Sequence, residues 1–175
     1  MRDNNYELYS VTKSVTSLLV GILNGEGKLG PNDKVVPGIV AAHPELKDAL
    51  ADKQDLKVRD LLSMSSGLFY KQTEGSDTLY YGVPNRLSVA AKSQAKLPPG
   101  KEFDYTDVNP VLVGAMVSAA ARQREQKFAE EKAVQAARDV ALPLGWHRSD
   151  RLCVGRMGTQ TASDRYGQAR DAATQ

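Results

Sequence analysis

The stretch LYSVTKSVTSLLVGILNGEG, Leu8 to Gly27, decides how the chain is interpreted. It predicts a helix from about Ser10 to Leu23, because several large apolar residues share one arc at about 100° per residue. Asn24-Gly25 predicts the end of that helix, since glycine tolerates the left-handed conformation. We expect the helix to be buried, with a polar stripe that faces a cleft. The apolar arc contains Val11, Val15, Leu18, Ile22, Leu19 and Leu23, and the stripe contains Ser10, Lys13, Ser14 and Ser17.

Ser10 and Lys13 lie three residues apart at the start of this helix. Residues at that spacing share a face, with roughly 5–6 Å between Cβ atoms, so the hydroxyl and the amine can meet. A serine hydroxyl needs a base to become a nucleophile, and a desolvated lysine has a lowered pKa that suits it to this task. The positive end of the helix dipole favours negative charge that develops nearby. The pair is therefore a candidate for nucleophilic catalysis.

The local pattern leaves a plainer interpretation open. Ser10 would then be an N-cap residue, and Lys13 a lysine whose stem covers apolar surface while its amine reaches water. A chain of this length contains S-x-x-K about once by chance. The second copy, Ser93 to Lys96, lies in a polar segment that runs into Pro98-Pro99, where no buried helix would desolvate the lysine. We reject that copy as a site.

The remaining segments predict a mainly helical chain with turn-rich connections. Asn109 is a favourable N-cap and Pro110 suits the first helical position, so a helix is expected to start there. Its apolar side would consist of Val111, Leu112, Ala115 and Ala119. Before that helix, we expect a turn with at most a short extended piece over Gly27–Gly38 and a short amphipathic helix within Leu56–Leu68 that Ser66-Gly67 stops. A long loop with at most one helical turn should follow over Phe69–Lys96, and an extended segment over Lys101–Tyr105. A further helix is expected over Gln126–Val140, which the stretch LPLG ends.

The composition excludes several classes of function. The chain has 175 residues, of which 41% are hydrophobic and 25% charged, as expected for one globular domain with a core. A net charge of +2 with scattered basic residues argues against nucleic acid as a partner. A single cysteine, Cys153, and two isolated histidines, His43 and His147, argue against a disulfide framework and a metal site. The longest apolar run, Leu18–Leu23, is too short to span a bilayer.

The two ends of the chain carry further expectations. Met1–Tyr9 lacks the apolar core and cleavage site of a signal peptide. As written, the chain is expected in the cytoplasm, and in the periplasm or outside the cell if the true N-terminus is missing. Residues 150–175 have few large apolar side chains and no period, so a polar tail, with disorder as its expected state, is predicted. The predicted division is therefore 1–149 and 150–175.

A second stretch, PPGKEFDYTDVNPVLVG (Pro98–Gly114), gives the serine and the lysine their context. S-x-x-K is the nucleophile motif of β-lactamases and penicillin-binding proteins. This chain resembles the branch that contains class C β-lactamases, serine D,D-peptidases, related esterases and 6-aminohexanoate-dimer hydrolases. The resemblance covers about Tyr9 to Gly145 and implies the helical part of the α+β β-lactamase/transpeptidase-like fold. The stretches that carry it, in the family's order, are YSVTKSVTSLLVGILNGEGKLGPND, LKVRDLLSMSSGL, PPGKEFDYTDVNPVLVG and LPLG.

The resemblance implies a role for each of three residues. Ser10 is the nucleophile that becomes acylated, and Lys13 is its proton acceptor or electrostatic activator. Tyr105, the tyrosine of the family's Y-x-N motif, shares the proton with Lys13 and passes it to the leaving group. A tyrosine beside a cationic lysine has a lowered pKa, which suits such a relay. Taken alone, Tyr105 would be a half-buried aromatic at the end of a strand.

This chain departs from the family pattern in two ways. Asp107 stands where the motif has asparagine, which favours ester or amide hydrolysis and a substrate-binding role toward an uncharged or cationic substrate. The nearby Asn109 is interpreted as a helix cap. The family's third motif, K-T-G or H-x-G, does not occur in the 175 residues. In the family this motif lies on a strand beside the serine, and that strand donates an oxyanion-hole N–H. Removal of such a donor lowers the rate about 10²–10³-fold.

The sequence therefore predicts a serine hydrolase that cleaves ester or amide bonds, β-lactams included, through an acyl-enzyme on Ser10. The alternative is a truncated, non-catalytic remnant or acyl-binding module that lacks the K-T-G/H-x-G strand. The expected partner is a small-molecule ester or amide, with no nucleic acid, no membrane span, no metal and no organic cofactor. With most of the antiparallel sheet missing, we expect the isolated chain to be marginally stable and weakly active or inactive.

Overall fold

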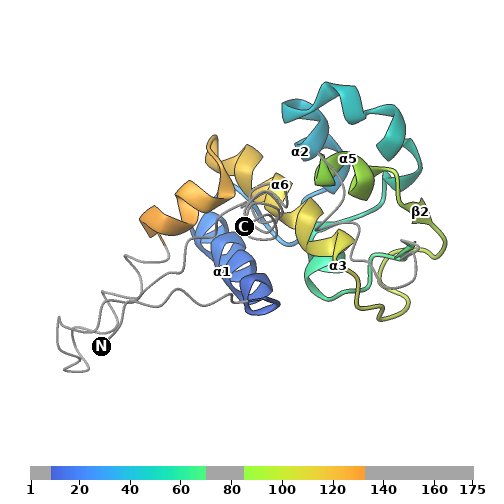
Figure 1. Ribbon diagram of the computed structural model, residues 1–175, viewed down its shortest axis with the longest axis horizontal. Coiled ribbons are helices and arrows are strands. Elements are labelled where there is room, and N and C mark those ends of the chain that lie inside the picture. Colours follow the sequence, from blue (N-terminus) through green and yellow to red (C-terminus); the bar gives the residue numbers. More distant parts are fainter. Residues whose placement is uncertain (1–8, 70–84, 133–175) are drawn as a thin grey trace, which may run out of the picture.

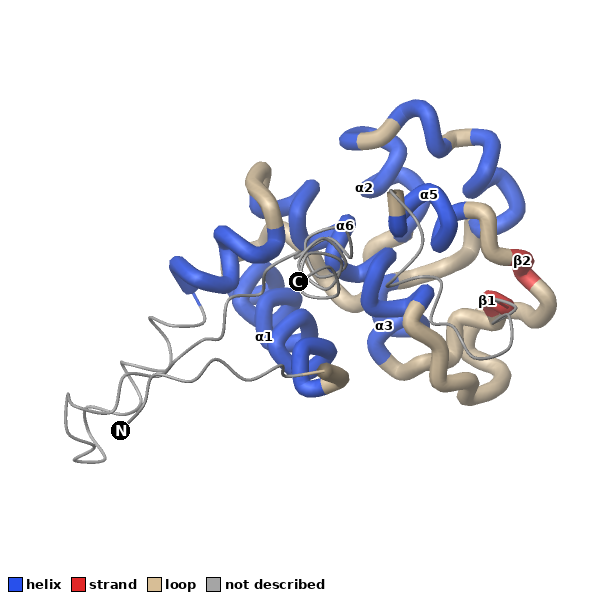
Figure 2. Tube along the Cα trace, viewed as in Figure 1, coloured by secondary structure: helices blue, strands red, loops and turns tan. Residues whose placement is uncertain are grey.

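The computed structural model describes residues 9–69 and 85–132. This part of the chain is mainly helical, with one small sheet (Figures 1 and 2), so the predicted mainly helical class is confirmed. Residues 125–132 are helical as well. The named elements, in chain order, are α1 (Val11–Gly25), α2 (Val35–Ala42), the 3₁₀ helices η1 (Pro44–Leu46) and η2 (Asp48–Lys53), α3 (Val58–Leu62), β1 (Leu68–Phe69), α5 (Arg86–Ala91), β2 (Gln94–Ala95) and α6 (Val108–Ala121).

Helix α6 is the centre of the fold. It packs against α1, α2, α3 and α5, and in Figure 1 it runs between α1 and the group formed by α2 and α5. A helix that is apolar around most of its circumference is stable only when several neighbours cover it. The predicted apolar side was therefore too narrow, because α6 also buries residues outside it. Within the predicted side, Val111, Ala115 and Ala119 are only partly buried. The buried residues of α6 are Val108, Asn109, Leu112, Val113, Gly114, Met116 and Val117.

Helix α1 buries only part of the apolar arc that the sequence predicted, together with Val20. Its buried residues are Leu19, Val20 and Leu23, whereas Val11 is 58% and Leu18 63% exposed. The periodicity identified apolar residues correctly, but it contains no information on which neighbour lies against them. Among the named elements, α6 supplies the extensive contact to α1, and Glu125 contacts the helix at Thr16.

Helix α2 was not predicted from the sequence. The segment 27–38 was predicted to hold at most a short extended piece, yet α2 begins within it, at Val35. Pro37 is compatible with this because it lies in the first turn, where a helix needs no backbone N–H donor. The extended piece is a single bridge between Lys34 and Lys57. Burial against the core stabilises the helix through Val35, Val36 and Ile39.

The segments on either side of the undescribed residues 70–84 also differ from expectation. Helix α3 ends at Leu62, earlier than the predicted stop at Ser66-Gly67, and Met64 takes a left-handed conformation with φ +56°. The loop predicted over residues 69–96 contains the six-residue helix α5 and strand β2. Strand β2 pairs antiparallel with β1, so that Leu68 lies opposite Ala95.

The start of α6 corrects the assignment of Asn109. The helix begins at Val108 with Asp107 in the N-cap position. Asn109 lies in the first turn with 0% exposure, and its Nδ2 donates to Met64 Sδ at 3.2 Å. A side chain packed against the loop after α3 cannot fold back to cap its own helix. Residues 101–105, predicted as extended, form neither helix nor strand.

Several predictions fall outside the described residues. They concern the end of the Gln126–Val140 helix, the LPLG stretch, His147, Cys153 and the tail over 150–175. Within the described ranges, no helix has the length and apolar character needed to cross a membrane.

Candidate active site

Ser10 lies at the N-terminus of α1, and its hydroxyl makes no capping bond to the helix backbone. It occupies the N-cap position, yet its side chain accepts no capping hydrogen bond, so the plain N-cap interpretation is wrong. The turn before it is tight, because Tyr9 has φ +44°, a conformation that non-glycine residues adopt rarely. Thr12 closes this turn by donating its backbone N–H and its hydroxyl to the Tyr9 carbonyl at 3.1 and 2.7 Å.

Lys13 points along the helix surface toward Ser10 and does not reach into water. Its Nζ donates to Ser10 Oγ at 3.1 Å and lies 2.6 Å from Asp107 Oδ1. The side chain of Lys13 is only 15% exposed. The ammonium is therefore held between the serine and a carboxylate.

Tyr105 completes the group from a distant part of the chain. Its hydroxyl donates to Ser10 Oγ at 2.9 Å, and its ring centroid lies 5.0 Å from Lys13 Nζ, within cation–π range. The residue is 55% exposed, so a molecule from solvent can reach the phenol. The structure thus brings Ser10, Lys13 and Tyr105 within contact of one another.

The loop that carries Tyr105 is fixed by the segment that follows α3. Gly100 N donates to Ser65 O and Asp104 N to Met64 O, both at 2.7 Å. Farther along, Gly67 O accepts from Lys96 N and Leu97 N at 3.0 and 3.3 Å. This crossing requires glycine, because Gly67 has φ +69° and a Cβ there would collide with the Leu97 carbonyl.

The charges of the site shift two pKa values. Burial lowers the pKa of Lys13, but the hydrogen bonds and negative charge of Asp107 and Tyr105 outweigh burial and raise it above 10.5. The pKa of Tyr105 is lowered below 10.0, first by its hydrogen bond with Ser10 and then by the hydrogen bond and positive charge of Lys13. The site therefore favours a charged ammonium beside a phenol that ionises readily.

Asp107 enters the site in a way that the sequence analysis did not foresee. It was predicted to bind substrate, and that role stays a prediction. What the structure adds is the ion pair with Lys13: Asp107 Oδ1 is shielded from solvent and has no other partner among the described residues. The acidic residues Asp104 and Asp107 on either side of Tyr105 were visible in the sequence, but no local spacing rule joins positions 13 and 107.

The second S-x-x-K has a different environment. The Ser93 hydroxyl donates to Ala90 O at 2.7 Å, and Lys96 Nζ lies 3.4 Å from the centroid of the Phe69 ring. The two side chains are thus engaged with other groups. This geometry agrees with the rejection of that copy as a site.

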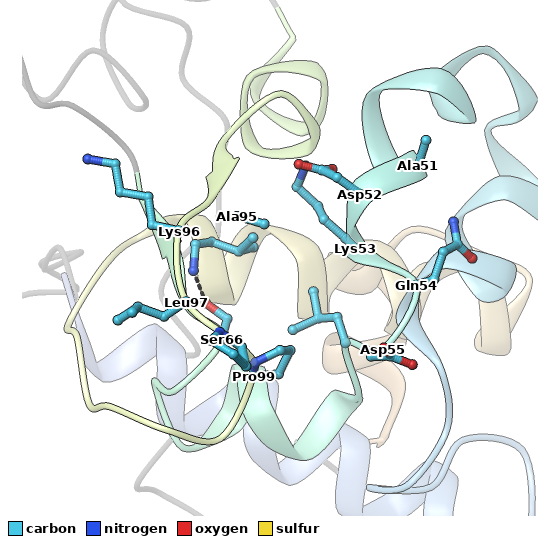
Figure 3. Close-up of a pocket in the computed structure, with 13 residues that line it drawn as sticks. Ala51, Asp52, Lys53, Gln54, Asp55, Ser66, Ala95, Lys96, Leu97 and Pro99 are labelled. Atoms are coloured by element: carbon cyan, nitrogen blue, oxygen red, sulfur yellow. Dashed lines mark hydrogen bonds and ion pairs between the residues drawn. The ribbon is translucent and has the colours of Figure 1, made fainter.

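A separate cavity of about 400 Å³ lies beside the β1–β2 sheet (Figure 3). Its rim includes Lys53, whose ammonium is paired with Asp52 at 2.5 Å. Ser66 and Pro99 contribute to its wall. Ser10, Lys13 and Tyr105 do not line this cavity. Among the described residues, no group of three or more His, Cys, Asp or Glu side chains is arranged to hold a metal ion.

Comparison with known proteins indicates the same family as the motifs. A family model described as β-lactamase matches residues 2–175. A provisionally named D-alanyl-D-alanine carboxypeptidase of Escherichia coli K12 is 28% identical over 146 residues, which are 80% of this chain and 32% of that protein. Protein flp of Staphylococcus aureus N315 is 27% identical over 128 residues, which are 70% of this chain and 24% of that protein. The chain thus spans a third or less of the length of these relatives.

Two solved structures share the arrangement of the helices. EstCE1, described as a hydrolase with promiscuous acyltransferase activity, is 27% identical with a TM-score of 0.57, over 83% of this chain and 39% of that one. A provisionally named β-lactamase from Bacteroides dorei DSM 17855 has the same TM-score, 0.57, at 21% identity, over 83% of this chain and 40% of that one. The helices therefore have the β-lactamase-like fold that the sequence predicted.

Proposed function

Since this chain belongs to the β-lactamase family, we propose that it carries the nucleophile and the proton-transfer groups of a serine hydrolase. One observation carries the proposal: Ser10 Oγ lies 3.1 Å from Lys13 Nζ and 2.9 Å from the Tyr105 hydroxyl. An adjacent group that takes the serine proton is one of the ways in which a serine nucleophile is activated.

Acylation begins when Ser10 Oγ attacks the carbonyl carbon of the substrate. The new C–O bond forms as the carbonyl π pair moves onto oxygen, and the serine proton passes to the Tyr105 phenolate. When the tetrahedral intermediate collapses, the bond to the leaving group breaks and Tyr105 returns the proton to the departing oxygen or nitrogen. Water then attacks the acyl-serine by the reverse proton path, which releases the acid and restores the Ser10 hydroxyl.

Lys13 acts in this scheme as a fixed positive charge. Its ammonium stabilises the Tyr105 phenolate and hydrogen-bonds to the serine oxygen as that oxygen becomes nucleophilic. The position of Ser10 at the N-terminus of α1 adds a favourable field for negative charge that develops nearby. No step needs a metal or an organic cofactor.

The substrates that we propose are small esters or amides, with β-lactams as strained amides. The names of the relatives support this choice, because a carboxypeptidase and a hydrolase with acyltransferase activity both transfer acyl groups. Tyr105 is 55% exposed, so that a small molecule has access to its side chain. Recognition of nucleic acid forms no part of the proposal.

Labelling with a fluorophosphonate tests the proposal against the alternative of a non-catalytic acyl-binding module. Intact-mass spectrometry of the folded chain is expected to show one adduct, which Ser10→Ala abolishes and Lys13→Ala slows at least about tenfold. Ser14→Ala, at an exposed serine of the same helix, is the matched control and should label normally. Folded protein without an adduct would favour the acyl-binding module.

A further inference from the structure

The ion pair between Lys13 and Asp107 distinguishes this site from a site that has the asparagine of the family's Y-x-N motif. Lys13 Nζ and Asp107 Oδ1 are 2.6 Å apart, and the two side chains are only 15% and 18% exposed. A carboxylate held this closely opposes a full positive charge, whereas the amide of asparagine would leave that charge uncancelled. Water and salt screen such a shielded pair only weakly.

In the resting site, where Tyr105 keeps its proton, the other groups that face Lys13 carry no charge that could cancel its own. From its own helix the ammonium meets the neutral Ser10 hydroxyl, and from the loop it meets the Tyr105 ring. Among the described residues, Asp107 is the only Asp or Glu that forms an ion pair with Lys13. The net charge of the resting site therefore depends on one carboxylate.

We propose that Asp107 is a positioning residue that acts through Lys13: it holds the ammonium beside Ser10 and cancels its charge, so that the site favours acyl donors without a carboxylate group. The preferred substrates are then neutral esters and amides. This inference rests on the proposed function for its substrate class, but the charge balance itself concerns Lys13 alone.

A consequence for substrates follows from Coulomb's law. An anionic acyl donor approaching Ser10 feels the attraction of Lys13 and the repulsion of Asp107 at similar distances, so that it gains little net energy. With asparagine at this position the attraction would remain. Asp107→Asn should therefore change the rate of acylation by anionic substrates relative to that by neutral substrates.

The first experiment measures Lys13 without any turnover. The pKa of Lys13 is determined by NMR titration of its side chain in the unsubstituted chain, in Asp107→Asn and in Asp104→Asn. Asp104 is an exposed carboxylate of the same loop, and its substitution removes an equal charge away from Lys13. We expect a pKa above 10.5 in the unsubstituted chain, a clear fall in Asp107→Asn and little change in Asp104→Asn.

Two results of the titration would overturn the proposal. One is a Lys13 pKa below its ordinary value in the unsubstituted chain. This result does not depend on whether any variant folds. The other is an equal change in Asp107→Asn and Asp104→Asn. Both results are independent of whether Ser10 is acylated, so they separate failure of this inference from failure of the proposed function.

The second experiment measures charge selectivity. Ser10 acylation by a penicillin, which carries a carboxylate, is compared with acylation by a neutral p-nitrophenyl ester in the same three proteins and in Asp107→Glu. Asp107→Asn should raise the ratio of the anionic to the neutral rate about tenfold, and Asp107→Glu, which keeps the charge, should restore a low ratio. An unchanged ratio in Asp107→Asn while Ser10 is still acylated would contradict the proposal.

Discussion

The phenol oxygen of Tyr105 lies 2.9 Å from the hydroxyl oxygen of Ser10, although 95 positions of sequence separate the two residues. The contact joins the first turn of α1 to the loop that leads into α6. Because α1 and α6 pack against each other and backbone hydrogen bonds at Gly100 and Asp104 fix that loop, the meeting of these side chains is a property of the fold. The predictions below test whether it is also a property of a reaction.

Tyr105→Phe removes the phenol oxygen and leaves the ring. We expect acylation of Ser10 to slow by about 10²–10⁴, since general acid–base groups typically contribute that much. The melting temperature should change little, because the side chain is 55% exposed. Phe103→Leu, at a 73% exposed aromatic of the same loop, is the control. Equal labelling rates in Tyr105→Phe and the unsubstituted chain would remove Tyr105 from the mechanism.

The rate of Ser10 acylation should depend on pH in a bell-shaped way. The reactive form has an ionised Tyr105 and a protonated Lys13. Since the pKa of Tyr105 is lowered below 10.0 and that of Lys13 is raised above 10.5, the rate should rise as Tyr105 loses its proton and fall only at higher pH, as Lys13 loses its own. Labelling rates from pH 6 to about 11, corrected for hydrolysis of the reagent, measure this profile. A rising limb that persists in Tyr105→Phe would show that another group is the base.

Gly67 and Gly27 form a matched pair for testing how the loop is held. Both have positive φ, +69° and +68°, but a Cβ at Gly67 meets the Leu97 backbone whereas one at Gly27 meets open space. Alanine in the left-handed conformation costs roughly 1–2 kcal/mol by itself, and a collision with backbone adds about 1–3 kcal/mol. Urea unfolding should therefore show Gly67→Ala to be clearly the less stable of the two variants. Equal losses would mean that the two segments are not closely packed at this crossing.

Glu125 is a half-buried carboxylic acid between α1 and α6 that the sequence did not reveal. Its Oε1 accepts a hydrogen bond from the Thr16 hydroxyl at 2.6 Å, and a Cβ at Gly114 would collide with its other oxygen. Glu125 forms no ion pair with any described Lys, Arg or His. Burial raises its pKa above 4.5, partly offset by the bond from Thr16.

The pH dependence of stability should change in Glu125→Gln. Because the folded-state pKa of this acid is raised, the protonated form is favoured in the fold, and its stabilisation is fully present below the unfolded pKa of 4.5 and lost as pH rises toward the folded value. Glutamine stays neutral, so Glu125→Gln should match the unsubstituted chain near pH 4 and melt at a higher temperature near pH 7. Glu130→Gln, exposed on the same helix, is the control. A difference that does not vary with pH would show that the pKa of Glu125 is the same in the folded and the unfolded chain.

The sequence predicted those parts of the site that depend on local spacing or on a family pattern. Ser10 and Lys13 meet because residues three apart share a helix face, and the Y-x-N pattern identified Tyr105. The ion pair of Lys13 with Asp107 joins two segments through space, and nothing local connects them. Asn109 was assigned as a cap for its residue type, but burial against Met64 determined its position.

The fold was predictable in class but not in the details of burial. Val11 and Leu18 belong to the predicted apolar arc and yet are exposed, because periodicity shows that a face is apolar and not which neighbour covers it. Helix α2 was missed because Pro37 and Gly38 resemble a turn. The burial of Val35 and Ile39 against the core overrides that local preference.

Rapid acid quenching during hydrolysis of a p-nitrophenyl ester, followed by peptide mass spectrometry, tests the central claim most directly. The account predicts that the acyl group of the ester is found on the peptide that contains Ser10, and that it is absent from Ser10→Ala. Turnover with no acyl group on Ser10, or an acyl group on Ser14 or Ser17 instead, would contradict it.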